Sequence, residues 1–366
     1  MRILLSGGGT GGHIYPALAL MRQIKKQHPQ AEFLYVGTER GLESTIVPKT
    51  GLNFQSVEIQ GLRRSFSLEN IKTLYLMLTS VQKSKKIIRA FKPDVVVGTG
   101  GYVCAPVLYA ARRLDIPTII HEQNSVAGVT NKFLAPYVNN IAICFEDVRS
   151  DFSKYAKKVV YTGNPRAQEV VDSEEITSLS TFHLKDDLPT VLVFGGSRGA
   201  EKINQSMVEA APFFEGKAYQ AILVTGQRHY EEIKTQLSGL NSVVDNVKVV
   251  PYVDNMPALF RSVDLVVCRS GATTLIELTA LGIPSVLIPS PYVTANHQLK
   301  NAESLAKKGA AQIIEEEALS GDSLFSKIDS LLQDDQVRME MSQQAISLGV
   351  PDAADRLFKV IQSLIE

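Results

Sequence analysis

The sequence predicts an α/β protein with two Rossmann-like, doubly wound domains that face each other across a cleft. Short apolar runs that end in turn residues alternate with longer stretches of helical period from end to end, which is typical of β-α-β units in parallel sheets. Residues 3–9 and 191–197 also open the two halves alike, with an apolar strand and a glycine turn. A length of 366 residues, at roughly 150 per domain, leaves room for two buried cores.

Six strands are expected in each half, with helices after most of them. The apolar runs of the first half predict strands at residues 3–6, 32–37, 54–57, 94–98, 118–121 and 140–144. Those of the second half predict strands at residues 190–194, 221–225, 247–250, 264–268, 285–288 and 311–314.

The domain boundary is expected at the turn formed by residues 163–166, because residues 172–181 after it are acidic, rich in Ser and Thr, and without a clear period. We therefore expect domains at residues 1–163 and 164–349. Residues 350–366 are expected to form a helix that packs back on the first domain. Pro351 favours its first turn, and one helical face carries the apolar residues Leu357, Phe358, Ile361, Leu364 and Ile365.

Charge and composition exclude several classes of protein. The 38 basic side chains balance the 38 acidic ones, so no global field attracts a polyanion and nucleic acid is not an expected partner. Three scattered cysteines (Cys104, Cys144 and Cys268) indicate a reducing compartment. The apolar run after Met1-Arg2 is too short for a signal peptide, and no 18 uninterrupted apolar residues occur, so we expect a cytosolic chain that does not cross a bilayer.

The first glycine turn, residues 7–12, follows a strand and precedes a helix. Its glycines let backbone amides approach an anionic oxygen or a pyrophosphate at a helix N-terminus. Gly7, Gly9 and Gly12 also satisfy the dinucleotide fingerprint, with Glu39 as the acid near the next strand, so a nicotinamide or flavin cofactor stays open. His13 begins the helix beside its positive end, which favours a neutral, proton-accepting imidazole fit for a general base. The alternative is that His13 only caps the turn or packs beneath it.

Two further segments of the first half lie at the carboxyl ends of predicted strands, where α/β sheets place their sites. Gly98-Thr99-Gly100-Gly101-Tyr102 is a second amide-rich turn, which suggests an extended anionic ligand. His121-Glu122-Gln123-Asn124 places four hydrogen-bonding side chains in succession, either as part of a site or as a polar loop start.

The second half repeats this pattern. Residues 195–199 form a glycine turn with Ser197 and Arg198, fit to hold a diphosphate. Glu277 falls within the first two turns of a helix after residues 268–274, where it either accepts ribose hydroxyls or complements the helix dipole. His297, Gln298 and Asn301 suit sugar hydroxyls. No Asp-x-Asp and no cluster with metal spacing occurs, so we expect no metal.

Together these segments resemble the MurG family, the UDP-N-acetylglucosamine:undecaprenyl-pyrophosphoryl-N-acetylmuramoyl-pentapeptide N-acetylglucosaminyltransferases of bacterial peptidoglycan synthesis. The resemblance covers essentially the whole chain. It rests on seven motifs in the family's order: GGTGGH (8–13), GTGGYVCAP (98–106), HEQNSVAGVTNK (121–132), GNPR (163–166), GGSRGA (195–200), CRSGATT (268–274) with Glu277, and NHQ (296–298).

The resemblance implies the GT-B fold, with the donor UDP-GlcNAc held by residues 164–349 and the acceptor by a membrane-associating domain, residues 1–163. It implies no cofactor, and cell-wall synthesis proteins as further partners. On the donor side it implies roles for Ser197 at the diphosphate, Glu277 at the ribose, Gln298 at the GlcNAc hydroxyls and the Val253 backbone at the uracil.

For the reaction, the resemblance implies that His13 is the base in an inverting transfer to the muramoyl 4-hydroxyl. Thr10, Gly11, Gly12 and Asn124 would line the reaction centre, with Arg166 approaching the donor. The acceptor side would include Gly100, Gly101, Tyr102, His121 and Glu122.

Because the acceptor carries a polyprenyl chain, we expect peripheral contact with the cytoplasmic face of the membrane through residues 63–89. The face combines Leu68, Ile71, Leu74, Tyr75, Leu78 and Val81 with Lys72, Lys83, Lys85, Lys86 and Arg89. Two other functions stay open: an NAD(P)-dependent oxidoreductase, from the glycine fingerprint, and a non-catalytic sugar-nucleotide-binding scaffold, from the basic amphipathic segment.

Overall fold

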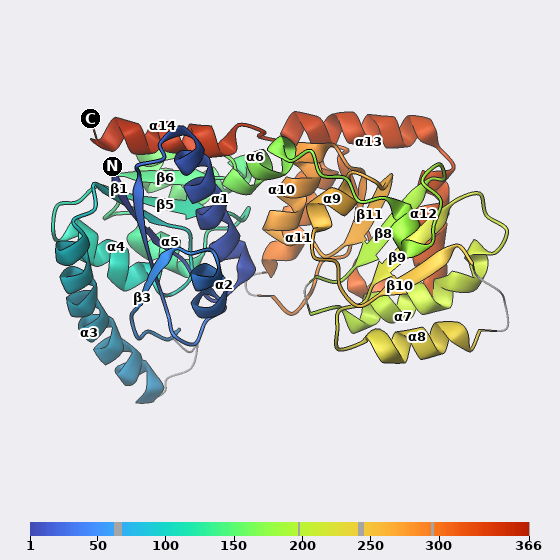
Figure 1. The fold of residues 1–366 in the computed structure, drawn as a ribbon, viewed down its shortest axis with the longest axis horizontal. Coiled ribbons are helices and arrows are strands. Elements are labelled where there is room, and N and C mark those ends of the chain that lie inside the picture. The colour runs from blue at the N-terminus through green and yellow to red at the C-terminus, as the bar shows by residue number, and fades with distance from the viewer. Residues whose placement is uncertain (62–67, 197, 241–244, 294–295, 366) are drawn as a thin grey trace. The chain divides into compact units, whose positions relative to one another are not determined.

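The computed structural model describes residues 1–61, 68–196, 198–240, 245–293 and 296–365 (Figure 1). The chain forms two compact units: Met1–Glu169 with Val350–Glu366, and Val170–Gly349. The boundary falls inside helix α6 (Pro165–Asp172), a few residues beyond the expected position after residue 163.

The sheet of the first unit is entirely parallel and has the strand order β3-β2-β1-β4-β5-β6-β7. The direction of winding reverses between β1 and β4, which is the switch point where α/β sheets bind ligands. The strands are β1 (Arg2–Ser6), β2 (Glu32–Gly37), β3 (Asn53–Ser56), β4 (Val95–Gly98), β5 (Thr118–Glu122), β6 (Asn140–Ile143) and β7 (Val159–Tyr161).

Two cores cover the two faces of this sheet. Alternate residues of β1 separate between them, with Ile3 and Leu5 in one core and Leu4 in the other, because successive side chains of a strand point to opposite faces. The helices of this unit are α1 (Gly11–Gln27), α2 (Glu43–Lys49), α3 (Leu68–Phe91), α4 (Cys104–Arg112), α5 (Val129–Leu134), α6 and α14 (Ala353–Ile365), with the 3₁₀ segment η1 (Glu146–Lys158).

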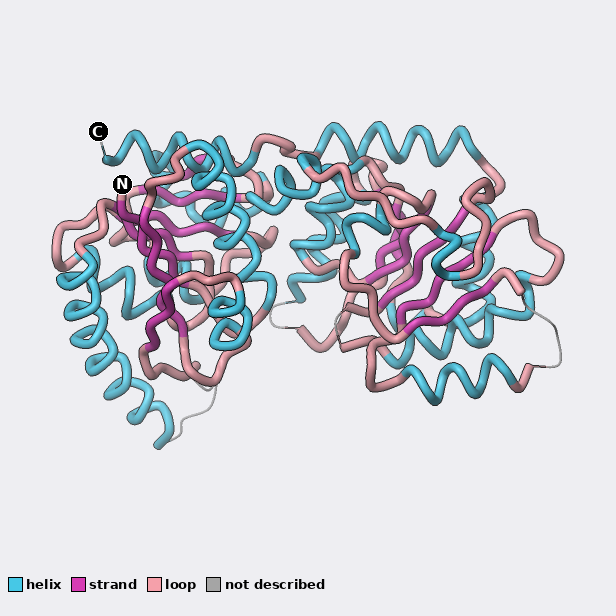
Figure 2. Tube along the Cα trace, in the orientation of Figure 1, coloured by secondary structure: helices cyan, strands magenta, loops and turns pink. Residues whose placement is uncertain are grey.

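The sheet of the second unit is also parallel, in the order β10-β9-β8-β11-β12-β13, with its switch point between β8 and β11. Figure 2 distinguishes the strands of each unit from the helices around them. The strands are β8 (Thr190–Phe194), β9 (Gln220–Val224), β10 (Val247–Val250), β11 (Leu265–Cys268), β12 (Ser285–Leu287) and β13 (Ala311–Ile313).

Helices of the second unit follow most of these strands. They are α7 (Glu201–Ala210), α8 (Tyr230–Ser238), α9 (Met256–Phe260), α10 (Ala272–Leu281), α11 (His297–Ala306), α12 (Gly321–Leu332) and α13 (Asp335–Leu348), with the 3₁₀ segments η2 (Leu179–Phe182), η3 (Ala211–Phe214) and η5 (Glu316–Ala318). Within the described ranges, no helix has the length and apolar content needed to cross a membrane.

The predicted class, two doubly wound parallel domains, is confirmed, and each of the twelve expected strands is present within a residue or two of its expected bounds. The strand β7 was not predicted; it is an edge strand of three residues that directly follows the basic pair Lys157-Lys158. Such a run is too short to show a period of its own. It pairs with β6, so its strand character comes from the neighbour rather than from local sequence.

The last helix packs on α1 of the first unit. Leu357 and Ile361 are fully buried, and the Phe358 ring meets the edge of His28, with 5.1 Å between ring centroids. Asp355 accepts hydrogen bonds from Gln23 and Gln27 of α1 at 3.0 and 2.7 Å. The apolar face of α14 thus contributes to the core beneath the helix that begins with the first glycine turn.

Candidate functional site

Both glycine turns of the first unit lie at its switch point and are bonded to each other. They follow β1 and β4, which are neighbours in the sheet. The Gly8 N–H donates to the Gly100 carbonyl oxygen at 3.1 Å. A Cβ atom on Gly101, whose φ is +86°, would lie 2.4 Å from the Gly8 carbonyl oxygen. Glycine is therefore required at position 101 both for its backbone conformation and for this close approach.

His13 lies in the first turn of α1 and is partly exposed. Its Nδ1 atom is 2.8 Å from the Gly8 carbonyl oxygen. Since a carbonyl oxygen only accepts, this contact requires a proton on Nδ1, and in the uncharged imidazole the lone pair then lies on Nε2. The exposed Thr10 hydroxyl oxygen lies 3.4 Å from the same Nδ1 atom. The ring is thus oriented as a proton acceptor through Nε2.

Glu43, which was not among the predicted site residues, is fully buried against this turn. Its Oε2 accepts from the Gly9 N–H at 2.9 Å, and its Oε1 accepts from the N–H and the hydroxyl of Thr38 at 2.9 and 2.7 Å. The amides of Gly8 and Gly9 are therefore both used inside the protein. An anion at this turn would therefore have to be met by the other backbone amides of the turn and of the helix N-terminus, because the Glu43 carboxylate and the Gly100 carbonyl oxygen already accept from Gly9 and Gly8.

His121 and Glu122 are buried at the carboxyl end of β5 and organise the backbone around them. His121 Nε2 lies 2.9 Å from the Gly163 carbonyl oxygen, while Gln123 donates its amide N–H to His121 Nδ1 at 3.0 Å. Complete burial lowers the pKa of His121 to about 4, so the ring is neutral at physiological pH. Both ring nitrogens are taken by protein partners.

The Glu122 carboxylate shapes the loop that carries Asn124. One oxygen accepts from the Asn124 N–H at 3.1 Å, and the other accepts from the Gly128 N–H and the Asn131 amide at 2.9 and 2.8 Å. Asn124 itself is only partly buried. The structure therefore gives Glu122 a scaffolding position behind the more accessible Asn124.

Arg166 is held within the first unit. Its guanidinium forms an ion pair with Glu169 and lies over the exposed ring of Tyr15, 5.9 Å from the centroid. Glu169 also pairs with Arg22 of α1. These contacts fix Arg166 to the same helix that carries His13.

Tyr102, in the second glycine turn, is 57% exposed, and its ring covers Gly61.

The second unit has its own glycine turn at the switch point, after β8. Gly199 has a φ of +75°, and a Cβ atom there would lie 2.0 Å from the Thr225 carbonyl oxygen, so the turn packs directly on the end of β9. Ser197, expected at the donor diphosphate, lies outside the described residues. Val253, expected at the uracil, is partly exposed in the loop between β10 and α9, and Glu277 is buried in α10.

A pocket of about 600 Å³ opens beside this turn. Gln298, one of the expected sugar-binding residues, lines it, and its Oε1 accepts from the Ser290 N–H at 2.9 Å. The pocket is lined by Gly195, Gly199, Ala200, Glu201, Lys202, Gln205, Arg269, Ser290, Tyr292, Gln298 and Glu316. Its position at the carboxyl ends of the strands and its mixture of cations, amides and hydroxyls fit a polar, phosphorylated ligand.

No role was predicted for Arg269, although it stands in the motif of residues 268–274, or for Glu316, yet the two form an ion pair in the wall of this pocket. Arg269 also donates to the carbonyl oxygens of Ile288 and Pro289 at 3.1 and 3.3 Å. The position of Arg269 directly after β11 could have marked it, whereas Glu316 stands in the run Glu315–Glu317, which looks like an ordinary solvated surface. In the described ranges, no group of three or more His, Cys, Asp or Glu side chains could hold a metal ion.

The class of protein is a glycosyltransferase: residues 3–143 match the glycosyltransferase family 28 N-terminal domain, and residues 190–357 match the family 28 C-terminal domain. The MurG crystal structure from Acinetobacter baumannii is similar, with a TM-score of 0.80, 27% identity and 99% of each chain covered. A putative UDP-N-acetylglucosamine 2-epimerase from Listeria monocytogenes, with a TM-score of 0.73 and 14% identity over 99% and 96% of the two chains, shares the fold alone.

Curated relatives are more similar. The UDP-N-acetylglucosamine--N-acetylmuramyl-(pentapeptide) pyrophosphoryl-undecaprenol N-acetylglucosamine transferase of Limosilactobacillus reuteri is 55% identical over 100% of this chain and 99% of its own. The Bacillus subtilis protein of that name is 51% identical with the same coverage. The chain therefore belongs to the MurG family, and the resemblance seen in its motifs is confirmed.

Proposed function

We propose that this chain transfers GlcNAc from UDP-GlcNAc to the 4-hydroxyl of MurNAc in undecaprenyl-pyrophosphoryl-MurNAc-pentapeptide, the step from lipid I to lipid II in peptidoglycan synthesis. Identity of 55% over the whole length to a transferase named for this reaction supports the assignment. The geometric observation that carries it is the His13 ring, whose Nδ1 is engaged by Gly8 and whose Nε2 is left as the proton acceptor.

In this reaction His13 Nε2 takes the proton of the acceptor hydroxyl as its oxygen attacks the anomeric carbon. The bond between that carbon and the diphosphate breaks, UDP leaves with the electron pair, and the α-linked sugar becomes β-linked. A general base contributes about a hundred- to ten-thousandfold in rate. Thr10, Gly11, Gly12 and Asn124 lie at or beside the first glycine turn and β5, so we propose that they line the reaction centre.

We propose that the donor occupies the pocket of the second unit. Gln298 would meet the GlcNAc hydroxyls, Glu277 the ribose, the Val253 backbone the uracil, and Ser197 with its turn the diphosphate. Negative charge that develops on UDP would be stabilised by backbone amides and by the cations of the pocket wall, Lys202 and Arg269. Arg166 adds a further cation, and no metal or cofactor takes part in this proposal.

On the acceptor side, we propose that Gly100, Gly101 and Tyr102 form the contact surface, with Tyr102 as the exposed side chain. His121 and Glu122 act behind this surface, since both are buried and hydrogen-bonded to protein groups. Their role would be to hold the loop with Asn124 in place.

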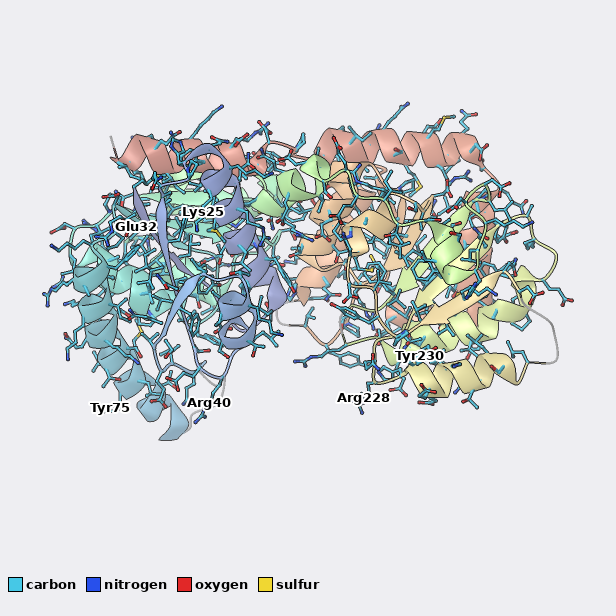
Figure 3. All side chains as sticks on the ribbon, in the orientation of Figure 1. Lys25, Glu32, Arg40, Tyr75, Arg228 and Tyr230 are labelled. Carbon is cyan, nitrogen blue, oxygen red and sulfur yellow. The ribbon has the colours of Figure 1, made fainter. Side chains whose placement is uncertain are left out.

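The polyprenyl chain of the acceptor requires contact with a membrane surface, and α3 offers one. Tyr75, labelled in Figure 3, and Leu78 are 65% and 63% exposed on this helix. Beside them is an apolar groove of about 570 Å³ lined by Met77, Leu78, Thr79, Val81, Gln82, Tyr109, Phe133 and Tyr137. Lys83, Lys86 and Arg89 are exposed on the same helix and suit anionic lipid headgroups.

Not all residues of the expected membrane face lie on the surface, and several lie outside the described residues. Val81 is 8% exposed and belongs to the core, because it points toward the sheet rather than outward. The side chains of Leu68, Ile71, Lys72 and Leu74 lie outside the described residues, as does Arg63. The proposed membrane face is therefore built on Tyr75 and Leu78, with Phe133 and Tyr137 from the neighbouring segment.

The test is UDP release by the full chain with UDP-GlcNAc and a lipid-linked muramoyl-pentapeptide acceptor in detergent. Release that requires both substrates supports the proposal, and its absence with a correctly folded protein would overturn it. The oxidoreductase alternative predicts tight NADH binding, which the engaged amides of Gly8 and Gly9 disfavour. The scaffold alternative predicts UDP-GlcNAc binding without turnover.

A further inference from the structure

The buried carboxylate of Glu43 lies beside the proposed reaction centre and contacts the first glycine turn. Glu43 accepts three hydrogen bonds: one from the Gly9 N–H, one from the Thr38 N–H and one from the Thr38 hydroxyl. It is an acceptor at each of these contacts. Glycine surrounds it: a Cβ atom on Gly8, Gly37 or Gly41 would come within 2.3, 2.5 or 2.1 Å of the Glu43 side chain. The backbone is therefore shaped to bring this carboxylate against the first glycine turn.

The carbonyl group of Gly8 and the N–H of Gly9 belong to one peptide unit. In a planar trans peptide these two groups point in opposite directions. Glu43 accepts from the N–H side at 2.9 Å, and His13 Nδ1 lies 2.8 Å from the oxygen on the other side. The peptide thus connects a carboxylate to an imidazole in one line of hydrogen bonds.

The orientation of this peptide determines which nitrogen of His13 carries the proton. In the observed orientation the Gly8 oxygen requires a proton on Nδ1, which leaves Nε2 as the acceptor. If the peptide were turned over, the Gly9 N–H would face the ring and would require a lone pair on Nδ1. The neutral ring would then carry its proton on Nε2 and could not act as a base there. Flanking glycines permit such a turn, since Gly9 already has a φ of +87°.

We propose that Glu43 is a positioning residue that selects the Nδ1–H tautomer of His13 through the Gly8–Gly9 peptide and so keeps Nε2 available to take the acceptor's proton. This inference rests on the proposed function for the role of His13 as base. It extends the logic of a carboxylate that orients a catalytic histidine, with one peptide unit placed between the two. Hydrogen bonds in such a chain polarise one another, so the carboxylate also makes the Gly8 oxygen a stronger acceptor.

The first experiment needs no change to Glu43. Proton-detected ¹⁵N NMR of histidine-labelled protein distinguishes the two tautomers, and His13→Gln identifies the His13 signals among the six histidines by their loss. The proposal expects the Nδ1–H form of His13 at pH values where the ring is neutral. A predominant Nε2–H form in the unmodified protein would overturn it.

The second experiment is Glu43→Gln, which keeps the size of the side chain but replaces one acceptor oxygen with an NH₂ donor. It cannot accept from all three donors, so the peptide loses its fixed orientation. We expect the Nδ1–H fraction to fall and kcat to fall about 10- to 100-fold, as when the hydrogen-bond partner that orients a metal-bound histidine is removed, with the KM for UDP-GlcNAc unchanged. A merely structural role would lower kcat without moving the tautomer.

Glu39→Gln is the matched control, because it removes the same charge from an exposed carboxylate whose partner is the Ser56 hydroxyl. It should leave both tautomer and kcat unchanged. A folded Glu43→Gln protein that keeps the Nδ1–H form and full kcat overturns the proposal. If that variant does not fold, the proposal is still tested by the unmodified protein, in which a predominant Nε2–H form of His13 would overturn it. Failure of the proposed function would appear separately, as an unmodified protein that releases no UDP.

Discussion

The Gly8 amide donates to the Gly100 carbonyl oxygen over 3.1 Å, and this bond joins two turns that are separated by more than 80 residues in the chain. The His13 ring lies against the joined backbone, since a Cβ atom on Gly100 would fall 2.6 Å from its Cδ2 atom. The two glycine turns are therefore one surface, and a change in either should reach the proposed base.

Gly101→Ala tests this surface, with Gly51→Ala as its control. Both glycines have positive φ, +86° and +75°, so alanine should cost about 1–2 kcal/mol of unfolding free energy at each. Only at Gly101 would the new methyl group also meet the Gly8 oxygen, whereas Gly51 has nothing within 4 Å. We expect a larger loss of stability in urea denaturation and a loss of turnover for Gly101→Ala alone. Equal losses in the two variants would contradict the close approach.

His13→Ala should lower kcat by about a hundred- to ten-thousandfold, because it removes the general base. UDP-GlcNAc affinity, measured by calorimetry, should stay unchanged, since the proposed donor pocket belongs to the other unit. His28→Ala is the control at the far end of α1, where the ring contacts Phe358 rather than the glycine turns. It should reduce stability but keep kcat. Normal turnover by His13→Ala would refute the assignment of the base.

Glu316→Gln should destabilise the second unit and weaken UDP-GlcNAc binding, because it leaves Arg269 without its charged partner in the pocket wall. The two side chains are only 12% and 14% exposed, and breaking a buried pair costs on the order of 3 kcal/mol. Glu303→Gln breaks a pair with Lys307 whose side chains are 42% and 73% exposed, and it should change stability by about 0.5 kcal/mol or less. Urea denaturation measures the free energy of unfolding of both variants, and calorimetry measures their affinity for UDP-GlcNAc. If Glu303→Gln loses as much stability and affinity as Glu316→Gln, the ion pair between Arg269 and Glu316 does not support the pocket.

His121 should make the first unit less stable in mild acid. Because burial lowers its pKa to about 4, the unfolded chain binds a proton that the folded one does not between about pH 6.5 and 4. Stability from this group is complete above pH 6.5 and falls by about 3 kcal/mol as the pH drops through that range. His121→Gln, which retains an N–H donor for Gly163, should show a correspondingly flatter dependence of the urea midpoint on pH. If the urea midpoints of the two proteins change with pH in the same way, the lowered pKa of His121 is refuted.

Leu78→Glu should reduce binding to vesicles that contain anionic lipid, since it places a negative charge on the proposed membrane face. Cosedimentation measures the effect, and unfolding should be unaffected because Leu78 is 63% exposed. Met339→Glu is the control, at an apolar residue that is 60% exposed on α13 of the second unit. If the two variants bind vesicles equally well, the proposal that α3 contacts the membrane is wrong.

The sequence predicted the strands well because buried parallel strands are short, continuous apolar runs, as in Val95-Val96-Val97 and Leu265-Val266-Val267. It predicted the glycine turns because positive φ and close backbone approach leave few alternatives to glycine. It missed β7, whose three residues become a strand only through pairing with β6. It also expected Val81 on the surface, since a helical pattern alone does not say which side faces the core.

Site residues could be predicted where the interacting groups are neighbours in the chain. They could not be predicted where the interacting groups come from distant segments. His13 stands beside its glycines in the chain, and its role could be argued from that position. Glu43 lies 34 residues from the Gly9 amide that it binds, and Glu316 lies 47 residues from Arg269. Neither residue has a local pattern that distinguishes it from an ordinary surface acid.

The sequence by itself determined the α/β class, the positions of twelve strands along the chain, the glycine turns and the family, because these depend on residue types at local spacing. Only the tertiary structure decided which amides are already occupied, that the Nδ1 atom of His13 lies against the Gly8 carbonyl oxygen, and that His121 and Glu122 are buried. These properties depend on contacts between distant segments, and hydrogen bonds and burial follow from the packed sheet rather than from neighbours in the chain.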